Sequence, residues 1–338
     1  MNIKEAIQEV CSRKHLSRDH TQEVFGHIMG GEATEAQIAA LIVALRMKGE
    51  TVEEITGAAE VMREKATHVI PDNPEHVVDT CGTGGDRSHT FNISTAAAFV
   101  AAGAGATVAK HGNRSVSSKS GSADVLEALG VNVAVGPETM KECLDTIGIC
   151  FLFAPALHKA MKFAIGPRKE IAVRTIFNVL GPLTNPSKAS TQLMGVFAPE
   201  LTDQLARVLN NMGSRKAFVV HSRDGLDEIS LSAPTLVCEL SEGEVKSFEV
   251  SPEQYGLKPA SLDQVVGGDA AQNAAVIRDV LGKKKGPARD IVLLNAGFAV
   301  AASGIAATPQ EGIALAAEAI DSGKAREKLE SLVKLTSA

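Results

Sequence analysis

The first 70 residues carry apolar side chains at helical spacing and no strand-like alternation. Thr34 directly precedes the most apolar of these stretches, where its hydroxyl can cap a helix. Thr51 and Glu54 have the spacing of a capping box. This part of the chain is therefore predicted to be all-helical, with helices over residues 3–10, 21–30, 34–46 and 51–65.

After Pro71 and Pro74, short apolar runs alternate with helical stretches. Such alternation predicts a largely parallel sheet with helices on both faces. Residues 235–250 instead predict a hairpin that turns at Glu242-Gly243. The expected fold class is α/β, with a small N-terminal all-helical domain and a larger, mostly parallel β-sheet domain flanked by helices. The expected strands cover residues 77–80, 107–110, 150–153, 192–196, 216–221 and 291–295.

The segment 157–190 has helical spacing interrupted by glycine and proline. We expect part of it to join residues 1–70 as a bridge or hinge between two domains. Residues 75–156 and 190–338 then form the α/β domain. Gly166-Pro167 and Gly181-Pro182 are the expected hinge points for a closure of the helical part onto the sheet, because glycine absorbs dihedral change beside a stiff proline.

Composition narrows the class of protein. The chain has 338 residues, with 34 basic and 40 acidic side chains and a net charge of −6, so no basic surplus indicates nucleic-acid binding. The five cysteines form no C-x-x-C pair, and the N-terminus begins as an amphipathic helix without a signal peptide. Because no apolar run approaches ~20 residues, no membrane span is expected. These features favour a reduced, cytoplasmic protein.

A glycine-rich polar segment follows the expected strand over 77–80. Gly82, Gly84 and Gly85 let the backbone turn tightly and approach a ligand. The helix expected over 92–102 offers unpaired N–H groups and a positive dipole end, which suit a phosphate. The segment lacks the third glycine of a dinucleotide fingerprint and the lysine of a P-loop, so it matches neither motif.

A second such segment follows the next expected strand and leads into a helix over 122–129. It holds Lys110, Arg114 and Lys119 together with several hydroxyls. A glycine-rich turn by itself is ordinary in an α/β fold, but a plain turn needs neither three cations nor a run of hydroxyls. Two such loops predict a ligand with two separate phosphate groups. The sequence leaves open which loop holds which phosphate.

Asp227 and Glu228 form a carboxylate pair after the turn at Asp224-Gly225. Such a pair is often a solvated turn, but this one follows an expected strand end. Mg²⁺ takes one or two carboxylates and completes its shell with water and substrate phosphate. The pair is therefore a candidate Mg²⁺ site.

Seven ordered motifs resemble those of the anthranilate phosphoribosyltransferase family, and the resemblance covers essentially the whole chain. It implies transfer of the phosphoribosyl group of phosphoribosyl pyrophosphate to the amine of anthranilate, in tryptophan biosynthesis, by a Mg²⁺-dependent homodimer. The motifs are Gly82-Thr83-Gly84-Gly85-Asp86, Lys110-His111-Gly112-Asn113-Arg114, Phe153-Ala154-Pro155-Ala156-Leu157-His158, Gly166-Pro167-Arg168-Lys169-Glu170, Arg174-Thr175-Ile176-Phe177-Asn178, Gly181-Pro182-Leu183-Thr184-Asn185-Pro186 and Asp224-Gly225-Leu226-Asp227-Glu228.

The resemblance also assigns site residues. Gly82, Asn113 and Arg168 would bind anthranilate, and the planar Arg168 guanidinium suits its carboxylate. Ser94, Asp227 and Glu228 would hold the metal. The residues expected to bind phosphoribosyl pyrophosphate are Gly82, Gly85, Asp86, Thr90, Asn92, Ile93, Ser94, Thr95, Lys110, His111, Gly112, Asn113, Arg114, Ser115, Val116, Ser117, Ser118 and Ser122.

No side chain is assigned as acid or base. His111 and His158 are either neutral packing residues near the acceptor pocket or catalytic groups, and the sequence does not separate these roles. Positioning two substrates supplies much of the rate in such a transfer, so a strong base is not required.

Two alternatives belong to other functional classes. A pyrimidine nucleoside phosphorylase resembles this fold, but its loop has Lys-His-Ser where this chain has Lys110-His111-Gly112, and it has no use for Arg168. A nucleic-acid-binding relative would carry a basic surplus and lose Asn113 and Arg168. The helix over 38–45 is apolar on more than one face, so it is expected either in its own core or against a partner subunit.

Overall fold

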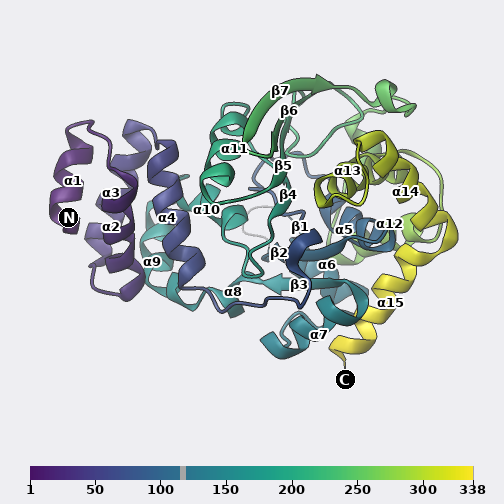
Figure 1. Ribbon diagram of the computed structural model, residues 1–338, viewed down its shortest axis with the longest axis horizontal. Helices are drawn as coiled ribbons and strands as arrows, with labels where there is room; N and C mark the ends of the chain where they lie inside the picture. Colours follow the sequence, from purple (N-terminus) through teal and green to yellow (C-terminus); the bar gives the residue numbers. More distant parts are fainter. Residues whose placement is uncertain (115–118, 338) are drawn as a thin grey trace.

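The computed structural model describes residues 1–114 and 119–337. Four N-terminal helices form a bundle at one end of an elongated molecule, and the remaining chain forms a sheet covered by helices (Figure 1). The bundle helices are α1 (Ile3–Cys11), α2 (Arg18–Gly30), α3 (Glu35–Lys48) and α4 (Val52–Glu64). The predicted all-helical N-terminal part is confirmed.

Each bundle helix begins at a polar side chain that accepts a hydrogen bond from its first turn. The capping residues are Asn2, Ser17, Thr34 and Thr51, and the predicted box of Thr51 with Glu54 is present. Such caps satisfy N–H groups that have no partner inside the helix. The short connections of the bundle therefore follow directly from local sequence.

A buried ion pair holds the bundle from inside. The Glu54 carboxylate accepts from Lys48 Nζ, from the Leu16 N–H and from the Thr51 N–H, each at 2.8 Å. The side chains of Lys48 and Glu54 are 2% and 0% exposed. Burying two charges is costly unless they are paired and hydrogen-bonded, and here the carboxylate has three donors.

The sheet has seven strands in the order β3-β2-β1-β4-β5-β6-β7. The first five strands in that order are parallel, and β6 and β7 extend them as an antiparallel hairpin. The mostly parallel sheet is thus confirmed. The strands are β1 (Val77–Asp79), β2 (Thr107–Gly112), β3 (Ile149–Phe153), β4 (Thr191–Gly195), β5 (Lys216–Ser222), β6 (Thr235–Ser241) and β7 (Glu244–Val250).

Strand β1 is the topological switch point of the sheet. From β1 the chain builds β2 and β3 on one side, and then returns to add β4 and β5 on the other. The connections therefore leave β1 in opposite directions, so a ligand crevice is expected at the carboxyl ends of β1 and β4. Open parallel sheets bind ligands in such a crevice.

Helices cover both faces of the sheet (Figure 1). One face packs with α11 (Leu201–Asn211), α10 (Phe177–Leu183), the bundle and α9 (Lys162–Ile171) into a single apolar core, so part of the segment 157–190 does pack with the N-terminal helices. The other face packs on α5 (Ile93–Gly103), α13 (Pro287–Ser303) and their neighbours. The remaining helices are α6 (Ser122–Leu129), α7 (Pro137–Ile147), α8 (Ala154–Leu157), α12 (Ala270–Leu281), α14 (Pro309–Ser322) and α15 (Lys324–Thr336).

The strand expected over 291–295 is wrong, because these residues lie inside α13. A short apolar run has the same appearance in a buried strand and in a buried helix. The run continues as small and apolar residues to Ser303, and Pro287 occupies the first turn, where proline is favoured. The length of the apolar stretch and this proline are the signals that identify a helix here.

Candidate active site

Three backbone segments meet at the switch point with no room for side chains. The Thr83 N–H donates to the Gly195 carbonyl oxygen at 2.8 Å. A Cβ on Gly82 would lie 2.8 Å from that oxygen, and a Cβ on Gly195 would lie 1.5 Å from the carbonyl oxygen of Asp227. The first glycine loop, the end of β4 and the loop after β5 are thus stacked through glycines, and this stack brings the candidate site residues into one place.

Lys110, on β2, is buried in this cluster with 4% of its surface exposed. Its ammonium donates to the carbonyl oxygen of Thr80 at 3.1 Å, and to the hydroxyls of Thr80 and Ser94, each at 3.3 Å. These bonds fix the end of β1 against the first turn of α5. A buried ammonium requires such partners, and its positive charge remains inside the site.

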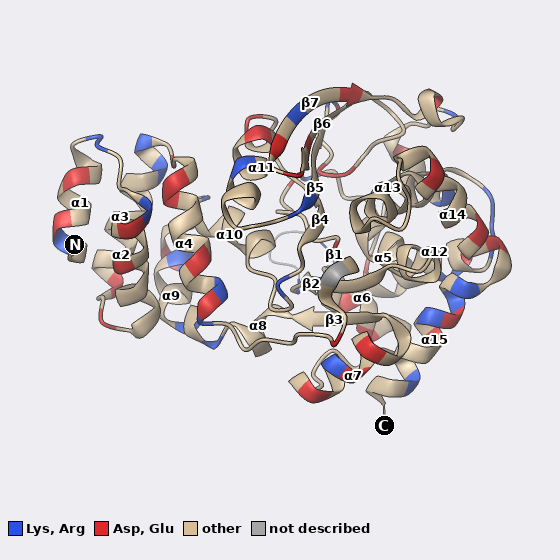
Figure 2. Ribbon diagram, in the orientation of Figure 1, with Lys and Arg blue, Asp and Glu red and all other residues tan. Residues whose placement is uncertain are grey.

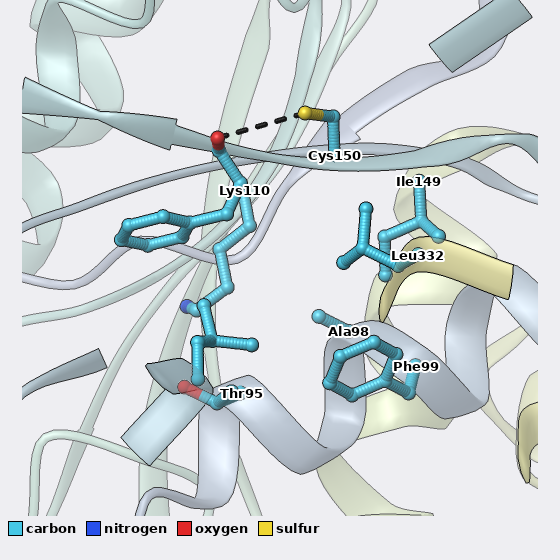
Figure 3. Close-up of a pocket in the computed structure, with 9 residues that line it drawn as sticks. Thr95, Ala98, Phe99, Lys110, Ile149, Cys150 and Leu332 are labelled. Atoms are coloured by element: carbon cyan, nitrogen blue, oxygen red, sulfur yellow. Dashed lines mark hydrogen bonds between the residues drawn. The ribbon is translucent and has the colours of Figure 1, made fainter. Parts of the chain in front are cut away.

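The alkyl stem of Lys110 lines a small apolar hollow together with Ala98, Phe99, Ile149 and Leu332 (Figure 3). The ammonium points away from this hollow, toward the loop cluster (Figure 3). The hollow therefore packs the lysine stem and offers little to a polar substrate.

Asp227 and Glu228 lie beside Ser94 and Asp86, as the sequence predicts for residues at neighbouring strand ends. Burial and the charge of Asp86 raise the pKa of Asp227. Burial and the charge of Asp227 raise the pKa of Glu228, while the Lys110 charge and a hydrogen bond with Ser94 partly offset this rise. Several carboxylates thus share a half-buried space with the Lys110 ammonium.

This donor set fits a divalent cation. It consists of carboxylate and hydroxyl oxygens with an excess of negative charge, which is the chemistry that Mg²⁺ prefers. A second group, Asp79, Cys81 and His111, has candidate ligand atoms within 4.8 Å of one another. Its carboxylate is already engaged, because Asp79 accepts from the His111 N–H at 3.1 Å and from Asn185 Nδ2 at 2.7 Å. We interpret this second group as a structural anchor between β1, β2 and the chain before β4.

The second glycine loop begins at Gly112 and is only partly described. Asn113 is exposed, and its side-chain oxygen accepts from the Arg114 N–H at 2.7 Å. The Arg114 guanidinium pairs with Asp124 at 3.1 Å and Glu127 at 2.6 Å, so its charge is directed toward α6. The predicted phosphate residues Ser115, Val116, Ser117 and Ser118 lie outside the described residues.

The other predicted phosphate residues surround the first loop. Thr90 forms an isolated bridge to the segment before α12, and the Asn92 amide donates to a carbonyl of the second loop at 3.2 Å. Ile93 and Thr95 are buried in α5, and Ser122 begins α6. Ile93 is apolar and 1% exposed, and its backbone N–H donates to the Phe91 carbonyl oxygen at 2.7 Å, so this residue offers a phosphate no free donor in this structure.

Arg168 lies on α9, which is docked on the bundle. A Cβ on Gly166 would lie 2.5 Å from Glu35 Oε1, so the helices are in close contact. The Arg168 guanidinium lies 5.2 Å from the ring centre of Phe177, and burial lowers its pKa. Among residues 1–114 and 119–337, none forms a hydrogen bond or ion pair with this side chain. A partly buried cation without a carboxylate partner is suited to an anionic ligand.

His111 and His158 form a pair beside this segment, with ring centres 5.0 Å apart. The Nδ1 atom of His111 bonds the Gly181 carbonyl oxygen at 3.1 Å, and both Nε2 atoms are buried without a partner among the described residues. Burial is the main cause that lowers the pKa of His111 to about 3 and that of His158 to about 4. Both imidazoles are therefore neutral at physiological pH.

Four residues of this region were not among the predicted site residues. Asp79 and Asn185 join β1 to the chain before β4, and Arg174 and Phe197 contact the first glycine loop or its support. Asn185 and Arg174 belong to two of the seven motifs, and Asp79 lies just before the first glycine loop. Their positions in the sequence therefore could have indicated that they belong to the site. Nothing in the local sequence distinguishes Phe197.

The bundle, the parallel sheet and the loop cluster at its switch point define a two-domain glycosyl transferase. The helical bundle domain of the glycosyl transferase family matches residues 4–66, and the a/b domain of that family matches residues 74–326. The chain is 55% identical to anthranilate phosphoribosyltransferases from Thioalkalivibrio sulfidiphilus, over 100% of both chains, and from Desulfosudis oleivorans, over 99% of this chain and 98% of the relative. The chain belongs to the anthranilate phosphoribosyltransferase family.

Solved structures agree with this assignment. The anthranilate phosphoribosyltransferase of Thermus thermophilus is 41% identical and superimposes with a TM-score of 0.94, covering 98% of this chain and 99% of that one. The enzyme of Saccharomyces cerevisiae, in complex with phosphoribosyl pyrophosphate and Mg, is 28% identical with a TM-score of 0.90, covering 99% and 98%. Neither the nucleoside phosphorylase nor the nucleic-acid-binding alternative is supported by these relatives.

The distribution of surface charge and the length of the helices are relevant to nucleic-acid binding and to membrane insertion. Basic and acidic side chains alternate along outer helices such as α4 and α15 (Figure 2). In the part of the chain that the structure describes, no helix is both long and apolar enough to cross a bilayer.

Proposed function

We propose that the protein transfers the phosphoribosyl group of phosphoribosyl pyrophosphate to the amine of anthranilate, in tryptophan biosynthesis. The bond from the ribosyl carbon to the pyrophosphate oxygen breaks, a bond from that carbon to the amine nitrogen forms, and the amine releases a proton. The observation that carries the proposal is the convergence of Lys110, Ser94, Asp227 and Glu228 at the switch point, with the unpaired Arg168 on the segment that borders it.

The phosphoribosyl side is assigned to the two glycine loops. The stack of Gly82, Gly195 and Asp227 keeps backbone N–H groups of the first loop and the carboxylate pair in fixed register. Asp227, Glu228 and Ser94 would hold Mg²⁺, which neutralises the charge of the departing pyrophosphate. The Lys110 ammonium fixes Ser94 in place and adds a positive charge to the same space.

The acceptor side is assigned to Arg168, with Asn113 and Gly82 as expected contacts. Arg168 offers two parallel donors to the carboxylate of anthranilate, a planar match that also orients the ring. The neutral pair His111 and His158 excludes water without competing for the carboxylate. Holding the weakly nucleophilic amine in line with the ribosyl carbon is then the main catalytic contribution of the protein.

A direct turnover assay tests the proposed function. Anthranilate fluorescence should fall when the protein, phosphoribosyl pyrophosphate and Mg²⁺ are all present. Omitting any one of the three should abolish the change. Persistent fluorescence at full protein and substrate concentrations, with product also undetected by mass spectrometry, would show that the proposed reaction is wrong.

We also propose a cytoplasmic homodimer. All five cysteines are free thiols, which suits a reducing compartment. Helix α3 buries Ile38, Leu41, Ile42 and Leu45 in the bundle. Its opposite side carries an apolar stripe, here called the α3 stripe, with Met47 72% exposed. The α3 stripe consists of Ala36, Ala40, Val43 and Met47, and a second copy of this chain is its proposed partner.

A further inference from the structure

Arg174 lies in the link between α9 and α10, yet its side chain reaches the first glycine loop. Its guanidinium donates a hydrogen bond to the Gly85 carbonyl oxygen. The guanidinium carbon lies 4.1 Å from the ring centre of Phe197, which follows the end of β4. The side chain therefore spans from the segment that carries Arg168 to the segment expected to hold a phosphate.

The contact depends on the shape of the loop. Gly85 has φ +82°, and a Cβ there would lie 3.2 Å from Arg174 Nη2, so a glycine leaves room for the guanidinium. Phe197 belongs to the same unit, because its N–H donates to Thr83 Oγ1 at 3.1 Å. Arg174, Phe197 and the loop residues Thr83 and Gly85 thus form one continuous set of contacts.

The partners of Arg174 differ from those of other arginines on the surface. Arg207, Arg223 and Arg326 each pair with a carboxylate. Within the described residues, Arg174 forms no ion pair, and its contacts are a backbone carbonyl and an aromatic face. This arrangement holds a backbone in a set orientation, since a guanidinium offers several donors in a rigid plane.

We propose that Arg174 is a positioning residue that couples the two substrate sites of the proposed reaction. It ties the acceptor segment to the first glycine loop, so that ordering the loop with phosphoribosyl pyrophosphate also sets the position of Arg168. The coupling between the two substrates rests on the proposed function. The positioning of the loop by Arg174 rests only on the contacts described above.

Coupling of this kind is reciprocal, so each substrate must change the affinity of the other by the same factor. In the wild type, saturating phosphoribosyl pyrophosphate should lower the Kd of an unreactive anthranilate analogue, and the analogue should lower the Kd of phosphoribosyl pyrophosphate equally. Arg174→Gln removes the charge and the planar stack. We expect it to bring the coupling factor close to one and to lower kcat about 10- to 100-fold, because small misplacements of reacting atoms have large effects on rate.

Two further variants separate positioning from general damage. Arg174→Lys keeps a cation and one donor over Phe197 and should recover part of kcat and of the coupling. Arg207→Gln removes an exposed arginine from α11 and should leave kcat, both Kd values and the coupling unchanged. A loss of kcat in Arg174→Gln with the wild-type coupling factor would overturn the inference.

Hydrogen exchange gives a readout that does not depend on turnover. Without ligands, Arg174→Gln should raise amide exchange in peptides covering residues 82–86, while peptides of α13 stay as protected as in the wild type. Wild-type exchange in that loop would overturn the inference even if activity fell. The two proposals can also fail separately. If loop exchange is faster in the variant but the wild type does not consume anthranilate, the structural role of Arg174 stands and the proposed function is wrong.

Discussion

At the scale of single residues, the buried Arg289 and the partly buried Arg168 show how a structural charge differs from the charge proposed for a site. Arg289 has a side chain only 3% exposed and pairs with both carboxylate oxygens of Asp321, at 2.7 and 2.9 Å. Arg168 has no such partner among the described residues, and burial lowers its pKa. Desolvating a cation without compensation is unfavourable, and this supports the anion site that is proposed at Arg168.

The first prediction concerns this unpaired cation. Arg168→Ala should raise the KM for anthranilate at least about 10-fold, as expected from loss of a charge-assisted hydrogen bond, while the KM for phosphoribosyl pyrophosphate stays within about twofold. Lys169→Ala, at the exposed neighbouring position, is the control. Steady-state kinetics with each substrate varied in turn would contradict the assignment if the pyrophosphate substrate alone lost affinity.

The second prediction concerns the carboxylate pair. Asp227→Asn combined with Glu228→Gln keeps the size of both side chains but removes their charge, so the Mg²⁺ concentration for half-maximal activity should rise strongly. The affinity for phosphoribosyl pyrophosphate should fall with it. Glu253→Gln, an exposed carboxylate away from the site, should behave as wild type. Identical Mg²⁺ titration curves for the double variant and the wild type would exclude this metal site.

The third prediction follows from the two neutral imidazoles. In the folded protein, burial lowers the pKa of His111 to about 3 and that of His158 to about 4, from 6.5. The unfolded chain therefore binds more protons from about pH 6.5 down to pH 4, and the stabilising contribution of the neutral histidines is lost as the pH falls. Asp79 acts in the opposite sense, because its folded pKa is raised to about 6.

Comparison with a variant isolates the histidine contribution. His111→Gln can still donate to the Gly181 carbonyl but does not titrate. Its free energy of unfolding should depend on pH less steeply than that of the wild type between pH 4 and 6, by up to about 1.4 kcal/mol per pH unit. Urea unfolding midpoints measured across this range test this, with His20→Gln on the exposed face of α2 as the control. Parallel curves for wild type and His111→Gln would contradict a neutral buried imidazole.

At the scale of elements, local signals predicted the bundle, the hairpin and five of the six proposed strands. The capping box at Thr51 and the glycine turn at Glu242-Gly243 depend on neighbouring residues alone, so the sequence contains them fully. The strand over 291–295 failed because burial on all sides removes periodicity, and burial is set by tertiary packing.

The candidate site was predictable where it depends on strand order, and not where it depends on how helices pack. Gly82 and Asp227 lie in loops that follow strands, Lys110 lies in the second half of β2, and strand order places the carboxyl ends of these strands at one edge of the sheet. The contact of Arg174 with Gly85 joins residues 89 positions apart and depends on how α9 docks on the bundle. Periodicity and motifs do not contain that information.

The fourth prediction tests the stack of backbones. Gly195→Ala places a Cβ 1.5 Å from the Asp227 carbonyl oxygen, so the loop after β5 must move. Activity should fall at least about 100-fold, since the carboxylate pair moves with that loop. Gly26→Ala, inside α2 with no atom within 4 Å of the new Cβ, should retain full activity and gain about 0.5–1 kcal/mol of stability.

Circular dichroism separates local damage from unfolding in Gly195→Ala. The variant should keep a native spectrum and a cooperative thermal transition. Wild-type kinetics in this variant would show that the register of the two loops is unimportant.

At the scale of the whole molecule, the chain passes between the bundle and the sheet through residues 65–76 and again through the segment 157–190. The expected hinge at Gly181-Pro182 is bonded to the sheet, because His111 contacts the Gly181 carbonyl and Gln192 Nε2 donates to the Pro182 carbonyl at 2.9 Å. We therefore propose that, if α9 moves toward the glycine loops on closure, the chain bends on the N-terminal side of these two contacts. The proposed bend lies near Ala172, where α9 ends in a left-handed conformation with φ 50°.

The fifth prediction tests the proposed homodimer. Val43→Glu places a charge in the α3 stripe without disturbing the four residues of α3 that are buried in the bundle core. Light scattering at micromolar concentration should give twice the chain mass for the wild type and the chain mass for the variant. A wild type that scatters as a single chain would refute the dimer, and a dimeric Val43→Glu would move the interface elsewhere.

The edge strands of the sheet bear on how the molecule can assemble. Strand β7, at one edge of the sheet, carries the exposed charged residues Glu244, Lys246 and Glu249, and α7 and α8 pack beside β3 at the other edge. Charged or covered edges resist the addition of a strand from another molecule. Head-to-tail growth into filaments by strand addition is thus disfavoured at both ends of the sheet. Self-association through a helix face can instead be satisfied by one two-fold contact, which closes the assembly at two copies and leaves nothing to propagate.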